Sequence, residues 1–187
     1  MRKLPLLLAL AHLAWLPAAP EEEEGTIMRP EDGSALPLGE ISIVAGGPGG
    51  KLELDGQAIN TEEPFPDVFH AKVTPSPGEH KLALVWQGGR REIRFFVGDN
   101  APPEFRPFRK HPPIAVECTW CHGLSRRGRF RFKGGCFHCH HQETFADIHQ
   151  HPPHILEQCG LCHNAHGSTV KAHLILQREK ACKLCHN

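Results

Sequence analysis

The stretch HKLALVWQGGRREIRFFV, residues 80–97, carries alternating apolar residues on both sides of a glycine-containing loop. In a β-strand, alternate side chains share one face, so each half of the stretch can bury one face and expose the other. The residues expected to face inward are Leu82, Leu84, Trp86, Ile93, Phe95 and Val97. Residues 87–90 read Gln-Gly-Gly-Arg and can reverse the chain between the halves. The stretch therefore predicts a β-hairpin.

Shorter strand signals precede this hairpin. Residues 41–44 read ISIV and are rich in β-branched side chains, and residues 51–56 read KLELDG, an alternating stretch that ends in an Asp-Gly turn. Short strands separated by turn signals are typical of a small β-sandwich, which we place over residues 38–99. The segments GEISIVAGGPGGKLELDGQAI and PSPGEHKLALVWQGG resemble the PEGA-type β-sandwich. That resemblance implies a surface or adhesion module without chemistry, and an unrelated immunoglobulin-like sandwich is a second interpretation.

The chain begins with a segment typical of export. Residues 1–20 combine the basic residues Arg2 and Lys3 with a short apolar run from Leu4 to Leu16. This order predicts a secretory signal peptide. A membrane anchor is the alternative, but the run is shorter than the roughly 20 apolar residues that a spanning helix needs. We therefore expect a periplasmic or extracellular protein with no transmembrane segment in the mature chain.

Composition divides the rest of the chain. Residues 21–37 are polar and predict a flexible leader, and residues 100–110 predict a proline-rich linker. Residues 21–103 hold 7 basic and 15 acidic residues, a net charge of −8, whereas residues 104–187 hold 12 basic and 6 acidic residues, a net charge of +6. This split indicates two modules with different surfaces, the second of which we place over residues 111–187.

All eight cysteines fall in four copies of the pattern Cys-x-x-Cys-His. The copies are Cys118, Cys121 and His122; Cys136, Cys139 and His140; Cys159, Cys162 and His163; and Cys182, Cys185 and His186. This pattern attaches a c-type haem, because its two thiols reach the two vinyl groups on one porphyrin edge while the adjoining imidazole ligates iron. Structural zinc and disulfides are the alternatives, but a four-cysteine zinc site needs no histidine after each pair. The pattern predicts four covalent haem c groups.

The region that contains these motifs resembles the multihaem cytochromes with doubled motifs, related to the cytochrome c3 and c7 group. Its second half carries the resemblance in His151-Pro-Pro, in CGLCHNAHG at 159–167 and in LILQREKACKLCHN at 174–187. The resemblance implies a carrier of electrons whose redox partners are other multihaem cytochromes or a membrane oxidoreductase. It also implies a haem-packed domain of irregular chain and short helices.

The first half of this region is a degraded copy of the second. His111-Pro-Pro precedes Cys118 much as His151-Pro-Pro precedes Cys159, which makes an internal repeat of roughly forty residues. In the second half, His166 lies three residues after the motif histidine His163. The first half lacks such a histidine, because Ser125 occupies the corresponding place after His122. An iron without a second protein ligand there would favour a haem-dependent reductase as the alternative function.

Each haem iron has a second axial position, for which histidine is the expected ligand. Met1 leaves with the signal peptide and Met28 lies in the expected leader, so methionine is nearly excluded. His111 and His151 are predicted ligands because each precedes Pro-Pro, and proline holds the residue before it in an extended conformation. Two imidazoles on each iron imply low reduction potentials.

The resemblance supplies the remaining two ligands. His166 stands at the CHxxH position of the family, and His141 follows His140 as in the CxxCHH motif of cytochrome c3. His149 is a near-equal alternative to His141. His138, His154 and His173 are further candidates for this position, but His138 is confined between the two cysteines of its motif, and surface or supporting roles are expected for His154 and His173.

Two other segments complete the expectations. Residues 126–133 read RRGRFRFK and could balance haem propionates; a docking strand for a partner is the alternative, and nucleic acid is not expected because of the export signal. A helix capped by Ser168 or Thr169 is expected to deliver the last motif.

The function expected from these observations is electron transfer by an exported tetrahaem protein, not enzymatic catalysis. The fold class expected is a small all-β sandwich followed by a haem-packed domain of irregular chain and short helices. The sandwich would tether the protein or join copies of it, and a chiefly adhesive or scaffolding role is a third interpretation.

Overall fold

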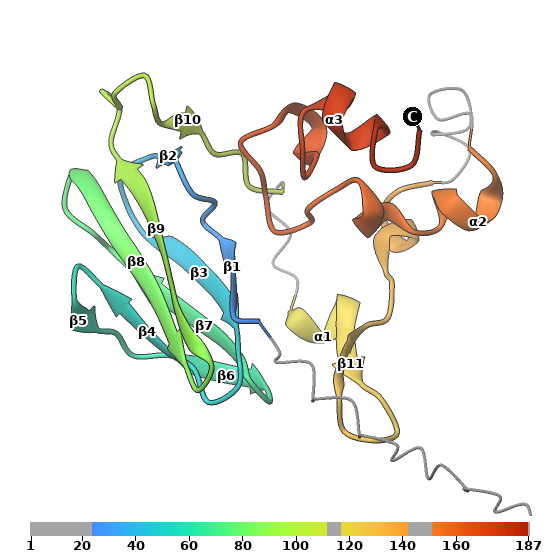
Figure 1. Cartoon of the computed structure of the whole chain (residues 1–187), viewed down its shortest axis with the longest axis horizontal. Helices are drawn as coiled ribbons and strands as arrows, with labels where there is room; N and C mark the ends of the chain where they lie inside the picture. Colours follow the sequence, from blue (N-terminus) through green and yellow to red (C-terminus); the bar gives the residue numbers. More distant parts are fainter. Residues whose placement is uncertain (1–23, 112–116, 142–150, 187) are drawn as a thin grey trace, which may run out of the picture.

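The computed structural model describes residues 24–111, 117–141 and 151–186. A layered arrangement of strands occupies one side of the molecule, and a region of short helices and turns occupies the other (Figure 1). The predicted signal peptide, residues 1–20, lies outside the described residues. Within the described part, no helix is both long enough and apolar enough to cross a membrane.

Two sheets packed face to face form a β-sandwich. Its strands are β1 (Thr26–Arg29), β2 (Ser34–Leu36), β3 (Ile41–Gly46), β4 (Lys51–Leu54), β5 (Gln57–Ala58), β6 (Glu62–Phe65), β7 (Val68–Val73), β8 (Gly78–Trp86), β9 (Gly89–Val97) and β10 (Arg106–Pro107). A four-stranded sheet has the order β1-β3-β7-β6, and a six-stranded sheet has the order β10-β2-β9-β8-β4-β5. Neighbouring strands are antiparallel, except that β2 runs parallel to both β9 and β10.

The predicted hairpin is confirmed in β8 and β9. Trp86 pairs with Gly89, which leaves Gln87 and Gly88 as a two-residue loop. Burial follows the predicted alternation, since Leu82, Leu84, Phe95 and Val97 are fully buried in the core between the sheets. Trp86 is less buried than predicted, because it packs against the edge of that core. The apolar periodicity of the sequence therefore sets which face of each strand is covered.

The Asp55-Gly56 turn is confirmed between β4 and β5. Both residues have positive φ, 51° and 79°, as a tight two-residue hairpin turn requires. Asp55 also bonds to the neighbouring strand β8. Its Oδ1 accepts the backbone N–H of Lys81, and its Oδ2 lies 2.7 Å from Nδ1 of His80. Burial works against the charged form, but these two hydrogen bonds outweigh it and hold the pKa of Asp55 below its ordinary value.

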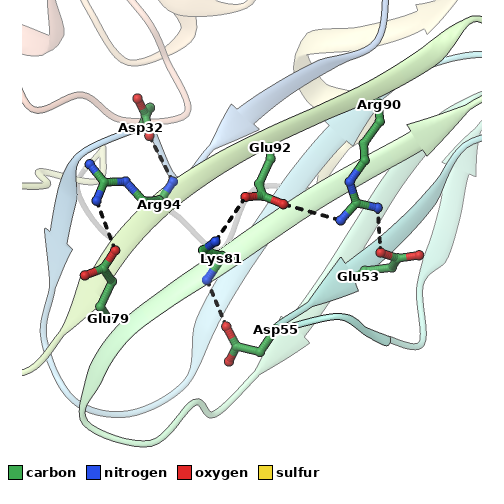
Figure 2. A network of polar contacts seen from close by, with 8 residues as sticks. All are labelled: Asp32, Glu53, Asp55, Glu79, Lys81, Arg90, Glu92 and Arg94. Atoms are coloured by element: carbon green, nitrogen blue, oxygen red, sulfur yellow. Dashed lines mark hydrogen bonds and ion pairs between the residues drawn. The ribbon is translucent and has the colours of Figure 1, made fainter.

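The outer face of the six-stranded sheet is polar and faces water. Arg90 bonds Glu53 across the sheet at 2.7 Å, and Glu92 lies within 3.7 Å of both Arg90 and Lys81 (Figure 2). Arg94 pairs in the same way with Glu79 at 3.2 Å. Exposed ion pairs of this kind add little stability, so their effect is to keep this face solvated and the opposite face buried.

The expected flexible leader is ordered in its described part. Residues 24–37 contain β1 and β2, and Ser34 is fully buried. A Cβ at Gly25 would lie 2.5 Å from the Trp86 ring, so the start of the chain packs against the hairpin through a residue without a side chain. The leader prediction failed because strand pairing and aromatic packing over a long sequence distance order a locally polar segment.

The expected linker, residues 100–110, is also attached to the sandwich. β10 lies within it and pairs with β2, and Phe105 is 5% exposed. The Phe108 N–H donates to the carbonyl of Ala35 at 2.8 Å. The segment therefore runs along the sandwich and does not act as a free spacer.

The C-terminal region consists of very short elements. They are α1 (Cys118–Cys121), β11 (His122–Leu124), β12 (Phe130–Phe132), α2 (Pro153–Leu156), α3 (Arg178–Cys182) and the 3₁₀ turns Cys136–His138, Cys159–Leu161 and Lys171–His173. Among the described residues beyond Phe105, Val170 is the one buried apolar side chain. This region therefore has no hydrophobic core built from its own described side chains.

The expected helix after Ser168 is replaced by a loop that contains the 3₁₀ turn Lys171–His173. The Ser168 hydroxyl accepts the N–H of Val170 and donates to the carbonyl of Leu174, so it is bonded within the loop and caps no helix. Ala172 and His173 have left-handed φ values of 59° and 54°, which end any helical path. A shorter helix, α3, ends at Cys182, so a helix does lead into the last motif as expected, but it begins later in the chain.

The core of the sandwich should carry its stability. Phe95→Ala removes a fully buried ring that packs 5.4 Å from His80, and we expect it to lower the free energy of unfolding by about 3–5 kcal/mol. Chemical denaturation followed by far-ultraviolet circular dichroism measures this loss. The matched control is Arg91→Ala on the same strand, which should change stability by less than about 0.5 kcal/mol. Equal effects of the two variants would contradict the assigned core.

Candidate functional site

All four Cys-x-x-Cys-His motifs adopt one local conformation. The backbone N–H of each motif histidine donates to the carbonyl of the first cysteine, at 2.9 Å in His140 and His163 and at 3.0 Å in His186, and the same bond joins His122 to Cys118. This bond closes one helical turn, so both thiols and the imidazole project from a single compact loop. The four motifs thus share a backbone that presents two sulfur atoms and one ring nitrogen together.

The cysteines are free thiols, and some of them lie close together. None of the eight is joined to another in a disulfide. Burial raises the pKa of Cys136 to about 11, and the neighbouring thiols of Cys159 and Cys121 add to that increase. Cysteines from three different motifs therefore approach one another. Across the described residues, no three His, Cys, Asp or Glu side chains converge to hold a metal ion directly.

Three motif histidines face a second histidine supplied by another part of the described chain. The ring centroids of His122 and His166 are 5.8 Å apart, those of His140 and His111 are 5.8 Å apart, and those of His186 and His151 are 6.0 Å apart. His111, His151 and His166 are the three histidines that the sequence predicted as distal ligands on the strength of Pro-Pro or CHxxH. Each of them is placed opposite a different motif.

These separations fit a metal between each pair of rings. Two imidazoles that bind one iron from opposite sides, each through a bond of about 2 Å, have centroids about 6 Å apart. Such ligation leaves each ring free to rotate about its iron–nitrogen bond, so it sets no interplanar angle. The observed angles of 9°, 79° and 40° span most of the available range. These separations leave room for a metal between the rings, and they also lie in the range of direct ring contacts such as that of His111 with His173 at 5.7 Å.

The apolar side chains around the motifs also fit a large apolar cofactor. Trp120 and Phe137 lie inside the first two motifs and are 54% and 40% exposed, while Leu161 and Leu184 lie inside the last two and are 47% and 60% exposed. Exposed apolar groups of this size inside all four motifs indicate a surface that is covered in the functional protein. A porphyrin attached at each cysteine pair would cover it.

The remaining candidate histidines are placed differently. His141 is exposed, and no ring contact joins it to another of the described residues. Its alternative, His149, lies outside the described residues. His138 lies within its own motif, with Nδ1 3.1 Å from the carbonyl of Gly135, and His154 is exposed. The fourth distal ligand therefore stays a prediction.

His163 shows how a motif histidine is oriented. Its Nδ1 lies 2.8 Å from the carbonyl of Ala172. A hydrogen bond at Nδ1 fixes the neutral tautomer whose lone pair is at Nε2, the nitrogen available to a metal.

His173 was given a surface or supporting role, and the structure places it beside His111 with ring centroids 5.7 Å apart. Burial lowers the pKa of His173, and its Nδ1 is buried without a hydrogen-bond partner in the described structure. No local pattern in the sequence pointed to this position, because the turn at Ala172 that carries His173 back towards His111 has no motif.

The basic segment 126–133 forms the loop between β11 and β12 together with β12 itself. Phe130 packs 4.8 Å from the His122 ring and 5.2 Å from Phe65 of the sandwich. The neighbouring arginines, Arg126, Arg127, Arg129 and Arg131, are exposed. One face of this hairpin therefore supports the first motif, and the other presents positive charge to solvent.

The sandwich holds the loop that carries His166. The Glu31 Oε2 accepts hydrogen bonds from the N–H of Thr169 at 2.8 Å and from its hydroxyl at 2.9 Å. Arg109 and Ser168 exchange two backbone hydrogen bonds, both 2.9 Å long. A Cβ at Gly167 would lie 2.5 Å from the Phe108 ring, so only glycine allows this close approach. These contacts fix the position of His166 from outside the motif region.

Burial, with the nearby His122 and Arg29, lowers the pKa of His166 to about 4. Burial likewise lowers the pKa of His122. Both shifts favour the neutral ring, which is the form that binds a metal.

No protein-family model matches the chain, and no curated protein matches it. Among solved structures, the chain is similar to the fibronectin(III)-like modules of CbhA from Clostridium thermocellum. That similarity has a TM-score of 0.33 and 14% sequence identity, and it covers 40% of this chain and 96% of the other. The function is therefore inferred from this chain's own residues.

The junction between the sandwich and the His166 loop is testable through Glu31. Glu31→Ala leaves both donors of Thr169 without their acceptor, and we expect it to lower the free energy of unfolding by about 1–3 kcal/mol. Amide hydrogen exchange should also show faster exchange at Thr169. The control is Glu104→Ala, an exposed carboxylate near the same junction. Unchanged exchange at Thr169 in Glu31→Ala would contradict this docking.

Proposed function

We propose that the protein is an electron carrier that holds four covalent haem c groups, most of them between paired histidines. The observation that carries the proposal is the coincidence of two patterns. Each of four motifs presents two thiols and an imidazole from one turn, and three of the motif histidines face a predicted second ligand at 5.8–6.0 Å. Neither zinc nor disulfide chemistry requires the facing histidines.

Each residue of the motifs would have a defined role in holding haem. The cysteines of each motif fix a haem by thioether bonds, and His122, His140, His163 and His186 bind iron from the attached side. His111, His151 and His166 bind from the opposite side, and His141 or His149 is proposed for the fourth position. Bound in this way, haem c supplies reversible one-electron oxidation and reduction at iron. Histidine on both sides favours a low potential.

The lack of a core supports dense packing of these groups. The described part of the region after Phe105 buries one apolar residue of its own, and thiols from three motifs lie close enough to alter one pKa. Attached groups would then form the core and lie near one another. Close spacing favours electron exchange within the domain.

The proposed location and partners are based on the export segment, residues 1–20, and on the sandwich. Residues 1–20 support export to the periplasm or beyond, where redox partners would be other multihaem cytochromes or a membrane oxidoreductase. The sandwich, whose segment 21–103 carries a net charge of −8, would tether the carrier or assemble copies of it.

The alternative of a haem-dependent reductase rested on the missing histidine at Ser125. His166 lies opposite His122 and supplies a second imidazole to the motif that lacks a nearby one. At the first motif this placement favours the carrier, because a reductase needs an iron with an open position. The carrier further requires His141 or His149 to bind opposite His163.

Haem attachment is testable by intact mass. After export in a host with a cytochrome c maturation system, the mature protein should exceed its polypeptide mass by four haem units. The paired variant Cys182→Ala with Cys185→Ala should lose one unit, since one motif can no longer form thioether bonds. A control variant, Ser125→Ala, should keep all four. A colourless product that contains zinc and no iron would contradict the proposal.

The distal ligands are testable one at a time. His111→Ala, His151→Ala and His166→Ala should each convert one low-spin iron to a high-spin, five-coordinate iron, as measured by electron paramagnetic resonance and absorption spectra. His154→Ala, an exposed histidine with no ring contact in the described structure, is the matched control and should leave every iron low-spin. A fully low-spin spectrum in all three ligand variants would rule out the assigned pairs.

A further inference from the structure

Arg29 is a partly buried cation at the junction between the sandwich and the motif region. It ends β1, and its guanidinium carbon lies 6.0 Å from the centre of the Phe108 ring. Its Nε is buried and has no hydrogen-bond partner in the described part of the chain. Within the same residues, no carboxylate forms an ion pair with it, whereas arginines 90, 91 and 94 of the sandwich each have at least one.

The acidic residues near Arg29 are engaged elsewhere. The Glu31 carboxylate accepts two hydrogen bonds from Thr169. Glu40 shares a small cavity of about 90 Å³ with Arg29, Phe108 and Lys110, but its Oε1 lies 4.0 Å from Nζ of Lys72. Two cations thus line a cavity in which no carboxylate forms an ion pair with either. Because a buried donor without a partner is costly, an anion from outside the described side chains is expected here.

The position of Arg29 relates it to one motif in particular. Phe108, over which Arg29 lies, is also the ring against which Gly167 packs, next to His166. His166 faces His122, the histidine that follows Cys118 and Cys121. Arg29 is therefore connected to the His122–His166 pair through Phe108 and Gly167.

We propose that Arg29 binds a propionate carboxylate of the haem attached at Cys118 and Cys121, and that the sandwich thereby raises that haem's reduction potential. This inference rests on the proposed function. A planar guanidinium matches a carboxylate with two parallel hydrogen bonds, and burial strengthens such a pair. A fixed positive charge near an iron stabilises its reduced form, which carries one positive charge less. The sandwich is then part of the redox unit and is more than a tether.

The test compares Arg29→Gln with Arg94→Gln in the fully matured protein. Arg94 lies on the same sandwich and pairs with exposed Glu79, so its loss removes an equal charge at a place assigned no cofactor (Figure 2). Potentiometric titration should show one of four transitions moved to lower potential in Arg29→Gln. We expect roughly a tenfold fall in that reduction equilibrium, about 59 mV for one electron. Arg94→Gln should leave all four transitions in place.

Two further variants make the outcome decisive. His166→Met should raise the potential of the same transition, because a thioether ligand raises haem potentials, and this identifies the affected haem. If Arg29→Gln does not fold, Arg29→Met replaces it, because an unbranched apolar side chain can still pack on Phe108 without the charge. It should give the same tenfold fall, and an unshifted transition would overturn the inference. Four attached haems with no shift in Arg29→Gln, or a shift in another transition, would show that Arg29 only packs on Phe108. Absence of attached haem in the unmodified protein would instead defeat the proposed function.

Discussion

The placement of two imidazole rings about 6 Å apart is the constraint on which the account of this protein depends. Ring pairs at this separation contribute only about 0.5–1.5 kcal/mol by direct contact, and in three cases one ring belongs to a motif whose thiols are not joined in a disulfide. A metal bound between the rings would hold their centroids at this distance. It also explains why a region with almost no buried side chains among its described residues adopts specific turns, since ligation would fix those turns in place of a hydrophobic core.

The β-sandwich contributes to this arrangement directly. Glu31 holds Thr169, Phe108 packs on Gly167, and the adjoining His166 is thereby held opposite His122. The proposed ligand His166 comes from the second half of the repeat, the motif that it faces comes from the first, and its support comes from the sandwich. Three segments distant in sequence therefore meet at one place.

Much of this could be predicted from the sequence, because the strongest signals are local. Alternation in 80–97 predicted the β8–β9 hairpin, and the Asp55-Gly56 pair predicted the turn between β4 and β5. Motif spacing identified the four groups of two thiols and one imidazole, each of which the structure places on one turn. What failed depends on partners far along the chain. The segment 24–37 is polar, and its strands form only because β3, β9 and Trp86 are available to them. The helix expected after Ser168 is absent because that hydroxyl bonds within its own loop while Thr169 docks on Glu31. Sequence also named His111, His151 and His166 without saying which motif each would face, since pairing is a property of the assembled chain.

X-ray diffraction from crystals of the matured protein, recorded at the iron absorption edge, tests the central claim most directly. Anomalous difference maps locate iron without reference to the polypeptide. The account predicts four iron peaks, three of which lie between His122 and His166, between His140 and His111, and between His186 and His151. Anomalous signal at the zinc edge centred on the cysteines, or iron positions that avoid these three ring pairs, would contradict it.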